Sequence, residues 1–410
     1  MAKVEITTPG IVKALDRFDY PRAIAEFIWN GFDAKATEVN VIYEFNQIGF
    51  ISKIQVIDNG YGIQKDQLYR KFIPFFESEK ELDPDVQRYS SAVHGKNGVG
   101  RLTFFKFALR AVWHTVFELE GDNYAYEISV DRDNLNTYSA TDPKKTDEAT
   151  GTSVTFTGIH AITAHNFEGD IYDFLIKDFG WFLELNAAKN YSLKINGEKL
   201  GYSQLIGDRD DFSISEDGTS FEVKYIRWEE FIREYSRYYF IDSQDNERYK
   251  DTTTLNNKSD HFYHSVYIKS KFFDRYLAPP KDNGLDNSQL LLFDDLKKQD
   301  IYKQLKEEID KYLRDKRRPF LKIYSDTLIA EFEKDGAFPD FSQNEWDKFR
   351  KSELANLVKG LYQIEPKLFT GLNIEQKKTF VRFLNLIMTP LQKRLDRDCP
   401  KCTLLKKCEF

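Results

Sequence analysis

The sequence predicts an α+β protein in which two mixed α/β parts are followed by a helical region. Residues 1–165 alternate helical and strand patterns. Residues 166–290 contain segments such as "SFEVKYIRW", in which apolar residues recur at every second position, as in strands. From residue 291 the apolar residues recur at three and four positions, which is typical of amphipathic helices. We therefore expect domains at residues 1–165, 166–290 and 291–410.

The composition is that of a soluble globular protein. Hydrophobic residues make up 41% of the 410 residues and charged residues 30%. No apolar run approaches the ~20 residues of a membrane span, so we expect no membrane association. The chain has only three cysteines, which excludes a disulfide scaffold and predicts a reducing cytoplasmic location.

Charge is distributed unevenly along the chain. The net charge is −7, yet residues 301–410 hold 23 Lys and Arg against 17 Asp and Glu. The basic cluster "RDKRRPFLK" at 314–322 lies in this part. The excess fits solvated helix faces, and it also fits contact with an acidic partner or nucleic acid.

A glycine-rich segment, "GKNGVG" at 95–100, precedes an apolar run. Leu102, Phe105 and Leu109 recur at i, i+3 and i+7, which predicts one buried face of a helix. Free backbone N–H groups at a helix N-terminus bind anions, phosphate above all, and glycines allow close approach of the backbone. The alternative is an ordinary turn that enters a helix. The spacing matches neither GxxxxGK[ST] nor GxGxxG.

Residues 23–36, "AIAEFIWNGFDAKA", predict a helix with one polar face. Glu26, Asn30 and Asp33 lie on this face because they are spaced at i, i+4 and i+7. Asn can ligate Mg²⁺ through its carbonyl oxygen, and Glu can accept a proton from an attacking water. The alternative is a plain solvated helix face.

Residues 51–63, "ISKIQVIDNGYGI", predict a strand that ends in a turn. Ile54, Val56 and Asp58 share one strand face, so the Asp58 carboxylate extends a buried apolar row. A buried carboxylate needs hydrogen-bond donors, and the exocyclic amine of adenine is one such donor. The glycines after it would let a flat base lie close to the backbone, although a plain turn between strands is the alternative.

Taken in their order along the chain, these segments resemble the motifs of the GHKL superfamily of ATPases, which includes DNA gyrase, MutL, MORC proteins, the 90-kDa heat-shock chaperones and the sensor histidine kinases. The helix at 23–36 resembles the N-box, and residues 58–63 resemble the DxGxG segment. Residues 95–100 resemble the second glycine box, and "TGTSVTF" at 150–156 resembles the Gly-Thr strand that closes the pocket. The resemblance covers residues 20–156. It implies a mixed sheet with helices on one face, the two-layer α/β sandwich called the Bergerat fold.

The resemblance also implies roles for individual residues. Glu26 would be the general base that polarises the water attacking the γ-phosphate of ATP, and Asn30 would ligate Mg²⁺. Asp58 would accept a hydrogen bond from the adenine amino group, with support from Thr152 through water. The other residues implied to bind the nucleotide are Asp33, Gly60, Gly62, Ile63, Gly95, Lys96, Asn97, Gly98, Val99 and Gly100.

Among the branches of the superfamily, the presence of Glu26 favours those that hydrolyse ATP over the sensor kinases. The hydrolysing branches place a transducer domain after the ATP-binding domain, and residues 166–290 have the position and strand content for it. Such a domain often sends a lysine to the γ-phosphate, for which Lys281 is the candidate and a solvated lysine the alternative. Residues 66–94 would form the lid over the nucleotide.

All three cysteines, Cys399, Cys402 and Cys408, lie in the C-terminal tail. A CxxC pair is half of a zinc site, but a structural zinc ion needs four ligands. Loose thiols are therefore the alternative to a zinc site shared with another chain or with further residues.

We therefore expect a Mg²⁺-dependent ATPase that acts as an ATP-gated clamp, a homodimer when ATP is bound, on nucleic acid or on a protein partner. Bacterial DNA handling or phage defence would be a fitting context. The alternatives are a chaperone-like ATPase with protein clients and a non-hydrolysing nucleotide-sensing module. The presence of both Glu26 and Asn30 argues against the last.

Overall fold

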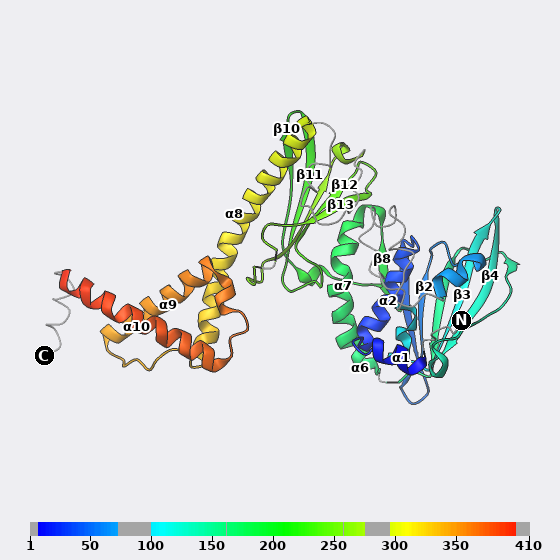
Figure 1. Cartoon of the computed structure of the whole chain (residues 1–410), viewed down its shortest axis with the longest axis horizontal. Helices are drawn as coiled ribbons and strands as arrows, with labels where there is room; N and C mark the ends of the chain where they lie inside the picture. Colours follow the sequence, from blue (N-terminus) through cyan, green and yellow to red (C-terminus); the bar gives the residue numbers. More distant parts are fainter. Residues whose placement is uncertain (1–6, 73–99, 161, 257, 275–295, 399–410) are drawn as a thin grey trace, which may run out of the picture. The chain divides into compact units, whose positions relative to one another are not determined.

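The computed structural model describes residues 7–72, 100–160, 162–256, 258–274 and 296–398 (Figure 1). Contacts within the chain define two compact units. The first unit contains residues 1–253 and 263–303, and the second contains residues 254–262 and 304–410. The α+β class and the helical C-terminal region are confirmed, whereas the division at residues 165 and 290 remains a prediction.

The first unit contains a 9-stranded sheet, with its main path in the order β5-β4-β3-β7-β2-β1-β8-β9 and β6 paired with β4. It is mixed, because β1 runs parallel to β8 and antiparallel to β2. β8 and β9 follow residue 165, so this sheet extends into the part of the chain expected to form the second domain. The strands are β1 (Glu38–Phe45), β2 (Ile51–Asp58), β3 (Arg110–Leu119), β4 (Asp122–Asp131), β5 (Ser139–Ala140), β6 (Lys144–Thr146), β7 (Gly151–Thr157), β8 (Ser192–Ile195) and β9 (Glu198–Lys199).

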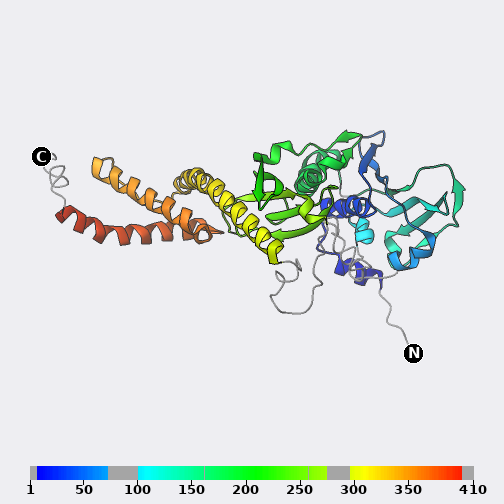
Figure 2. The same ribbon diagram turned by 90° about the horizontal axis from the view of Figure 1, so that it is seen from above.

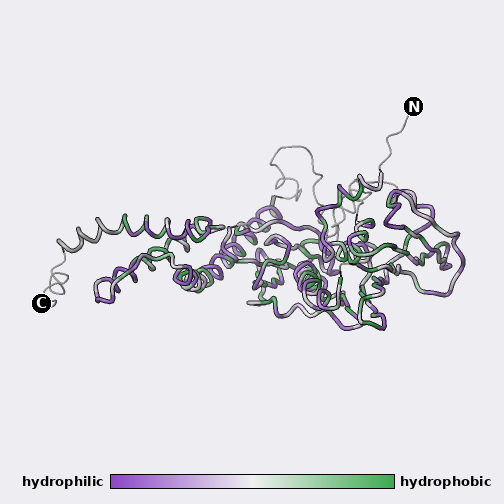
Figure 3. The backbone as a smooth tube through the Cα atoms, turned by 90° about the horizontal axis from the view of Figure 1, so that it is seen from below, coloured by the Kyte–Doolittle hydropathy of each residue, from purple (hydrophilic) through white to green (hydrophobic). Residues whose placement is uncertain are grey.

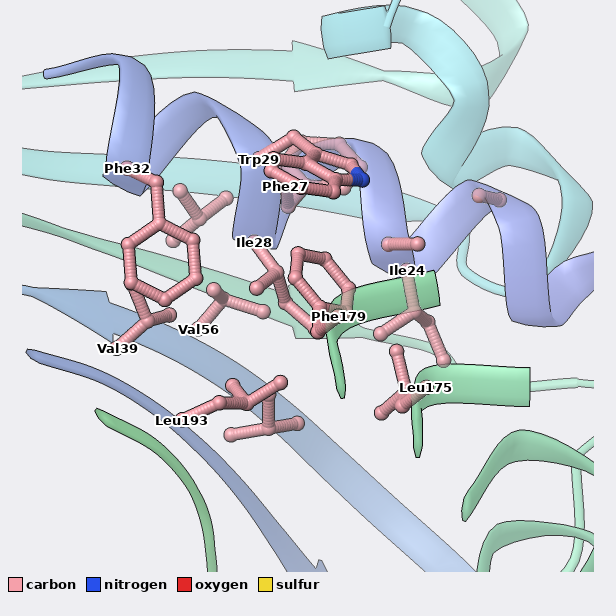
Figure 4. Packing of buried hydrophobic residues seen from close by; sticks show 14 of the residues in the cluster. Ile24, Phe27, Ile28, Trp29, Phe32, Val39, Val56, Leu175, Phe179 and Leu193 are labelled. Carbon is pink, nitrogen blue, oxygen red and sulfur yellow. The ribbon is translucent and has the colours of Figure 1, made fainter. Parts of the chain in front are cut away.

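Two helices, α2 (Tyr20–Asp33) and α7 (Tyr172–Leu185), pack together on this sheet (Figures 1 and 4). Apolar side chains of both helices meet the buried residues Val39, Val56 and Leu193 of three neighbouring strands (Figure 4). The two layers are those that the GHKL resemblance implied.

Trp29 is the central contact between the two helices. Its ring stacks on Phe179 of α7 at a centroid distance of 4.4 Å, and its Nε1 donates a hydrogen bond of 2.7 Å to the Asp178 carboxylate. Burial raises the pKa of Asp178, and the Trp29 hydrogen bond opposes that rise. One side chain therefore supplies both apolar packing and a donor for a buried acid.

Shorter helices complete the first unit. They are α1 (Thr8–Ala14), η1 (Lys65–Gln67), α3 (Leu68–Phe72), η2 (Gly100–Lys106), η3 (Arg132–Asn134), α6 (Ala164–Asn166), η4 (Phe167–Ile171), η5 (Ala187–Lys189), η6 (Ser203–Leu205) and η7 (Lys271–Phe273).

The helix expected after the glycines is shorter than predicted. η2 is a 3₁₀-helix that ends at Lys106; Leu102 and Phe105 are buried as expected, but Leu109 is 51% exposed. The backbone N–H of Leu109 donates to the carbonyl of Thr157 at 3.0 Å, where β3 begins to pair with β7. Strand pairing therefore ends the helical segment before Leu109 can join its buried face.

A 5-stranded sheet follows, in the order β10-β11-β14-β12-β13, and α7 also packs against it. The Trp181 ring stacks on Tyr239 at 5.7 Å, and the hydroxyl of Tyr267 donates to the Trp181 carbonyl at 3.0 Å. α7 is thus shared between two sheets. The strands are β10 (Ile206–Glu216), β11 (Thr219–Trp228), β12 (Arg237–Ile241), β13 (Glu247–Thr252) and β14 (Tyr263–Lys269).

The helices of the C-terminal region are α8 (Leu296–Lys334), α9 (Glu345–Ile364), η8 (Pro366–Phe369) and α10 (Ile374–Asp398) (Figure 2). Hydrophobic and hydrophilic residues alternate along them (Figure 3). A separate core that includes Phe332, Leu354 and Val358 holds the second unit together. Among the described residues, none of the helices combines the length and the apolar composition needed to cross a lipid bilayer.

Trp29→Ala is expected to lower the free energy of unfolding of the first unit by about 3–5 kcal/mol, because it empties a large buried volume and removes a donor from Asp178. Chemical denaturation followed by tryptophan fluorescence or circular dichroism measures the loss. Leu119→Ala is the control, because Leu119 ends strand β3 of the 9-stranded sheet and is 50% exposed. Its substitution should change the free energy of unfolding little. Equal effects of the two substitutions would contradict the central role of Trp29.

Candidate functional site

The polar row of α2 lies on the helix as the spacing predicted. Asp19 caps the helix by accepting a hydrogen bond of 2.9 Å from the Arg22 N–H. Glu26 and Asp33 are half-buried, whereas Asn30 is exposed. The three side chains therefore run along the border between the buried and solvated sides of α2.

Glu26 lies against the end of the glycine-rich segment. A Cβ atom added to Gly100 would lie 2.5 Å from Glu26 Oε2, so any other residue at this position would displace the carboxylate. The Thr103 hydroxyl fixes this contact, because it lies 2.7 Å from the carbonyl of Gly100 and 3.3 Å from that of Ala23 in α2. The fold thus brings the predicted base next to the last predicted phosphate-binding glycine.

Asp58 ends β2 as a half-buried carboxylate. It accepts a 2.8 Å hydrogen bond from the Gly60 N–H and another from the backbone N–H of Thr152 on β7. Burial nevertheless raises its pKa from 3.8 to about 6. The carboxylate is therefore short of donors, as expected for a residue that takes one more from a ligand.

The turn after Asp58 is held in place by neighbouring strands. Asn59 Oδ1 accepts hydrogen bonds from the N–H groups of Thr37 (2.9 Å) and Glu38 (3.0 Å). Gly62 has φ +71°, and an added Cβ would lie 2.1 Å from the Val116 carbonyl oxygen. Only glycine fits there, because the backbone of β3 occupies the place of a side chain; the predicted approach of a base to Gly62 stays a prediction.

Thr115 on β3 connects these parts and was not predicted from the sequence. Its hydroxyl is fully buried, accepts a 2.9 Å hydrogen bond from the Ile63 N–H and lies 3.1 Å from the Thr152 hydroxyl. Thr115 and Thr152 face each other across the paired strands β3 and β7. No local sequence pattern marks Thr115 as a site residue, because its contacts depend on the pairing of β3 with the distant strand β7.

Arg101, directly after Gly100, is a second residue that the sequence did not single out as a site residue. Its Nη2 donates a 2.7 Å hydrogen bond to the carbonyl of Phe72, and its guanidinium lies 5.6 Å from the centre of the Phe72 ring. Burial lowers its pKa to about 10, so it stays cationic at neutral pH. A positive charge is therefore fixed beside Gly100.

Several predicted residues lie outside the described part of the chain, so their roles remain predictions. They are Gly95, Lys96, Asn97, Gly98, Val99, Lys281, Cys399, Cys402 and Cys408, together with residues 73–94 of the expected lid. Among the residues that are described, no group of three or more His, Cys, Asp or Glu side chains is arranged to hold a metal ion.

The arrangement of α2, the Asp58 turn and η2 agrees with a comparison to protein families. Residues 19–156 match the family described as "Histidine kinase-, DNA gyrase B-, and HSP90-like ATPase". These residues form a GHKL domain. The match begins at the capping residue of α2 and ends in β7, so it spans every segment that carried the resemblance.

Solved structures give distant similarities to larger parts of the chain. The ATPase region of Saccharomyces cerevisiae topoisomerase II is 14% identical, with a TM-score of 0.36, covering 61% of this chain and 72% of its own. The Aquifex aeolicus MutL ATPase domain complexed with ADP is 13% identical, with a TM-score of 0.31, covering 61% and 91%. No curated protein matches the chain.

The raised pKa of Asp58 predicts a pH-dependent stability of the GHKL domain. The folded-state pKa lies above the ordinary one, so the folded protein binds the proton more tightly and gains stability as the pH falls through 6. Between pH 7 and pH 5 the gain should be about 1 kcal/mol relative to Asp58→Asn, which cannot titrate. Urea unfolding of both proteins measures it, and a constant difference would contradict the assignment.

Thr115→Val should destabilise the domain by about 1–3 kcal/mol, because the Ile63 N–H and the Thr152 hydroxyl lose a buried partner while the volume is kept. If these groups shape the adenine pocket, ATP affinity should also fall several-fold. Thr115→Ser restores the hydroxyl and serves as the control. Thermal unfolding and ATP titration measure the two effects, and a Val variant that matches wild type in both would exclude the role.

Proposed function

We propose that this chain binds ATP with Mg²⁺ and hydrolyses it, and that it works as an ATP-gated dimeric clamp on nucleic acid or a protein partner in the cytoplasm. One observation carries the proposal: within a GHKL domain, the Glu26 carboxylate packs against Gly100, where the glycine-rich segment ends. A proton acceptor is thereby held beside the position proposed for the phosphates.

The adenine end of the proposed site is built around Asp58. Its donor-poor carboxylate would accept a hydrogen bond from the exocyclic amine of the base. Gly62 would let the base lie against the backbone, and Thr152 would support the amine through water, itself held by Thr115. Gly60 would keep Asp58 oriented through its N–H, and Ile63 would line the pocket.

Asn30 fits the role of a magnesium ligand. Its side chain is exposed one turn beyond Glu26, and its amide forms no hydrogen bond with a residue that the structure describes. The amide oxygen is thus available, and a carbonyl ligand suits a hard cation. When bound, Mg²⁺ would supply positive charge that offsets the negative charge of the phosphates. Asp33, one further turn along α2, would contact the nucleotide from the same side.

In the proposed reaction a water molecule attacks the γ-phosphorus while Glu26 accepts its proton. The bond from the γ-phosphorus to the bridging oxygen breaks, and ADP and inorganic phosphate leave. Half-burial of Glu26 limits its contact with bulk water, and the fixed charge of Arg101 lies beside the same segment. Lys281, which lies outside the described residues, is the proposed donor to the γ-phosphate.

The clamp part of the proposal is supported by α7. This helix packs on the sheet of the GHKL domain and, through Trp181, on the 5-stranded sheet. A displacement of α7 relative to one sheet would therefore change its contacts with the other. Nucleotide contacts that exist only in a closed dimer would bias the chain towards it. Bacterial DNA handling or phage defence is the proposed context.

A chaperone-like role has weaker support. It calls for an extended apolar surface on the second domain, expected at residues 166–290. Among the described residues 166–274, the exposed large apolar side chains are Phe231 and Tyr235 only.

Glu26→Gln should lower the turnover number for ATP hydrolysis by about 100-fold or more while ATP affinity stays within a few-fold of wild type, because a proton acceptor is lost but the shape is kept. Phosphate release and ATP titration measure the two quantities. Glu127→Gln, an exposed change on β4, is the control.

Unchanged hydrolysis by the Glu26 variant would show that the base lies elsewhere. If wild type binds ATP without hydrolysing it, the chain is a nucleotide-sensing module. The dimer is tested with the same variant by light scattering, since an ATP-loaded protein that stays monomeric excludes the clamp.

A further inference from the structure

The middle of α8 is strongly basic. Residues 311–322, "KYLRDKRRPFLK", contain six Lys and Arg and one acid, Asp315. Two of the cations have contacts within the unit: Arg317 Nε donates to Asp260 at 2.6 Å, and Lys316 lies 5.6 Å from the centre of the Tyr312 ring. The other four are exposed, namely Lys311, Arg314, Arg318 and Lys322.

These four side chains share one side of the helix, which we call the basic face. At 3.6 residues per turn, Lys311, Arg318 and Lys322 lie within about 20° of one direction, and Arg314 lies about 60° from it. The face extends along about 16 Å of the helix axis. Asp315 is the one acid on it, so the face carries a net charge of about +3 at neutral pH.

The basic face differs from most cations of α9 and α10. Six cations of α9 and α10 lie within 4 Å of a carboxylate, namely Lys348, Arg350, Lys351, Lys359, Lys377 and Lys378. In contrast, no cation of the basic face forms an ion pair with any residue that the structure describes. The positive charge is therefore left uncompensated within the unit and is available to an external anion.

We propose that the basic face binds the phosphate backbone of nucleic acid. Duplex DNA carries one negative charge per about 1.7 Å of its axis, so a row of four cations about 16 Å long meets a continuous line of charge. Two of the four are arginines, whose planar guanidinium groups can form paired hydrogen bonds with phosphate oxygens. The proposal names nucleic acid as the client of the function proposed above, but the binding itself requires no ATP hydrolysis.

An anionic lipid surface fits the basic face less well. Helices that lie on membranes insert an exposed apolar face beside the basic one. In this part of α8, Ile309 and Leu313 have no exposed surface and Leu321 is 4% exposed. Ile323, at 69%, is the one strongly exposed large apolar side chain among the described residues of α8, and a single side chain does not make an apolar face. The basic face of α8 therefore carries exposed positive charge without an apolar stripe beside it.

The test is the salt dependence of binding to fluorescently labelled random-sequence duplex and single-stranded DNA, followed by anisotropy with the full chain. In the test variant the four cations of the basic face are replaced by Gln (K311Q, R314Q, R318Q, K322Q). The control variant carries four exposed cations from elsewhere replaced in the same way (K13Q, K144Q, K199Q, K367Q).

Wild type and control should share one slope of log affinity against log salt. The test variant should have a slope shallower by about 3.6 on duplex, or about 2.8 on single strands, at 0.9 or 0.7 per lost contact. At low salt its affinity should be at least 10-fold weaker.

Three results would overturn the proposal. The first is that wild type binds neither DNA. The second is that the test variant keeps the wild-type salt slope. The third is that poly-glutamate displaces wild type from DNA at equal charge concentration, which would indicate an acidic protein partner. ATP hydrolysis without DNA is measured on all three proteins. A failure of hydrolysis with DNA binding intact would then affect only the proposed function.

Discussion

The burial of α2 between the sheet and α7 is the constraint on which the rest of the GHKL domain depends. One side of α2 is fixed by Phe27, Ile28 and Trp29, all at most 3% exposed. Because this side cannot rotate, the polar row on the opposite border must face outward at a set position. The row can then meet Gly100, since η2 is fastened to the same helix through Thr103. The geometry of the site follows from apolar packing several residues away from it.

Local patterns in the sequence predicted the parts of the site that a single element decides. The i, i+4, i+7 spacing placed Glu26 and Asn30 on one helix face, and the alternation of β2 placed Asp58 beside buried residues. The contacts of Thr115 and the early end of η2 were not predicted, because both follow from the pairing of β3 with β7. The end of β7 lies about 50 residues after η2, beyond the range of periodicity arguments.

The same limit applies to α7. α7 was not predicted from the sequence, and its residues are apolar on nearly all sides, as in a helix that is buried all round. The structure supplies the answer: one side meets α2 and the other meets the 5-stranded sheet. Glu184, 5% exposed near the end of α7, accepts a 2.9 Å hydrogen bond from Tyr202 and pairs with Arg209 and Lys224 of the second sheet. A movement of α7 relative to the second sheet would break these contacts and leave a buried charge without partners. α7 and the second sheet are therefore expected to move together.

Asp58 shows how the site is at once unfavourable for folding and favourable for binding. Two backbone N–H groups do not offset the cost of burying its charge, as the pKa of about 6 indicates. A ligand that brings a donor to the carboxylate would relieve that cost only in the bound state. Part of the binding free energy would then come from relief of a strain already present in the folded chain, and the same ligand would lower the pKa of Asp58. Binding and folding are therefore linked through one carboxylate, but in opposite directions: a fall in pH through 6 favours the folded state and weakens the binding of such a ligand.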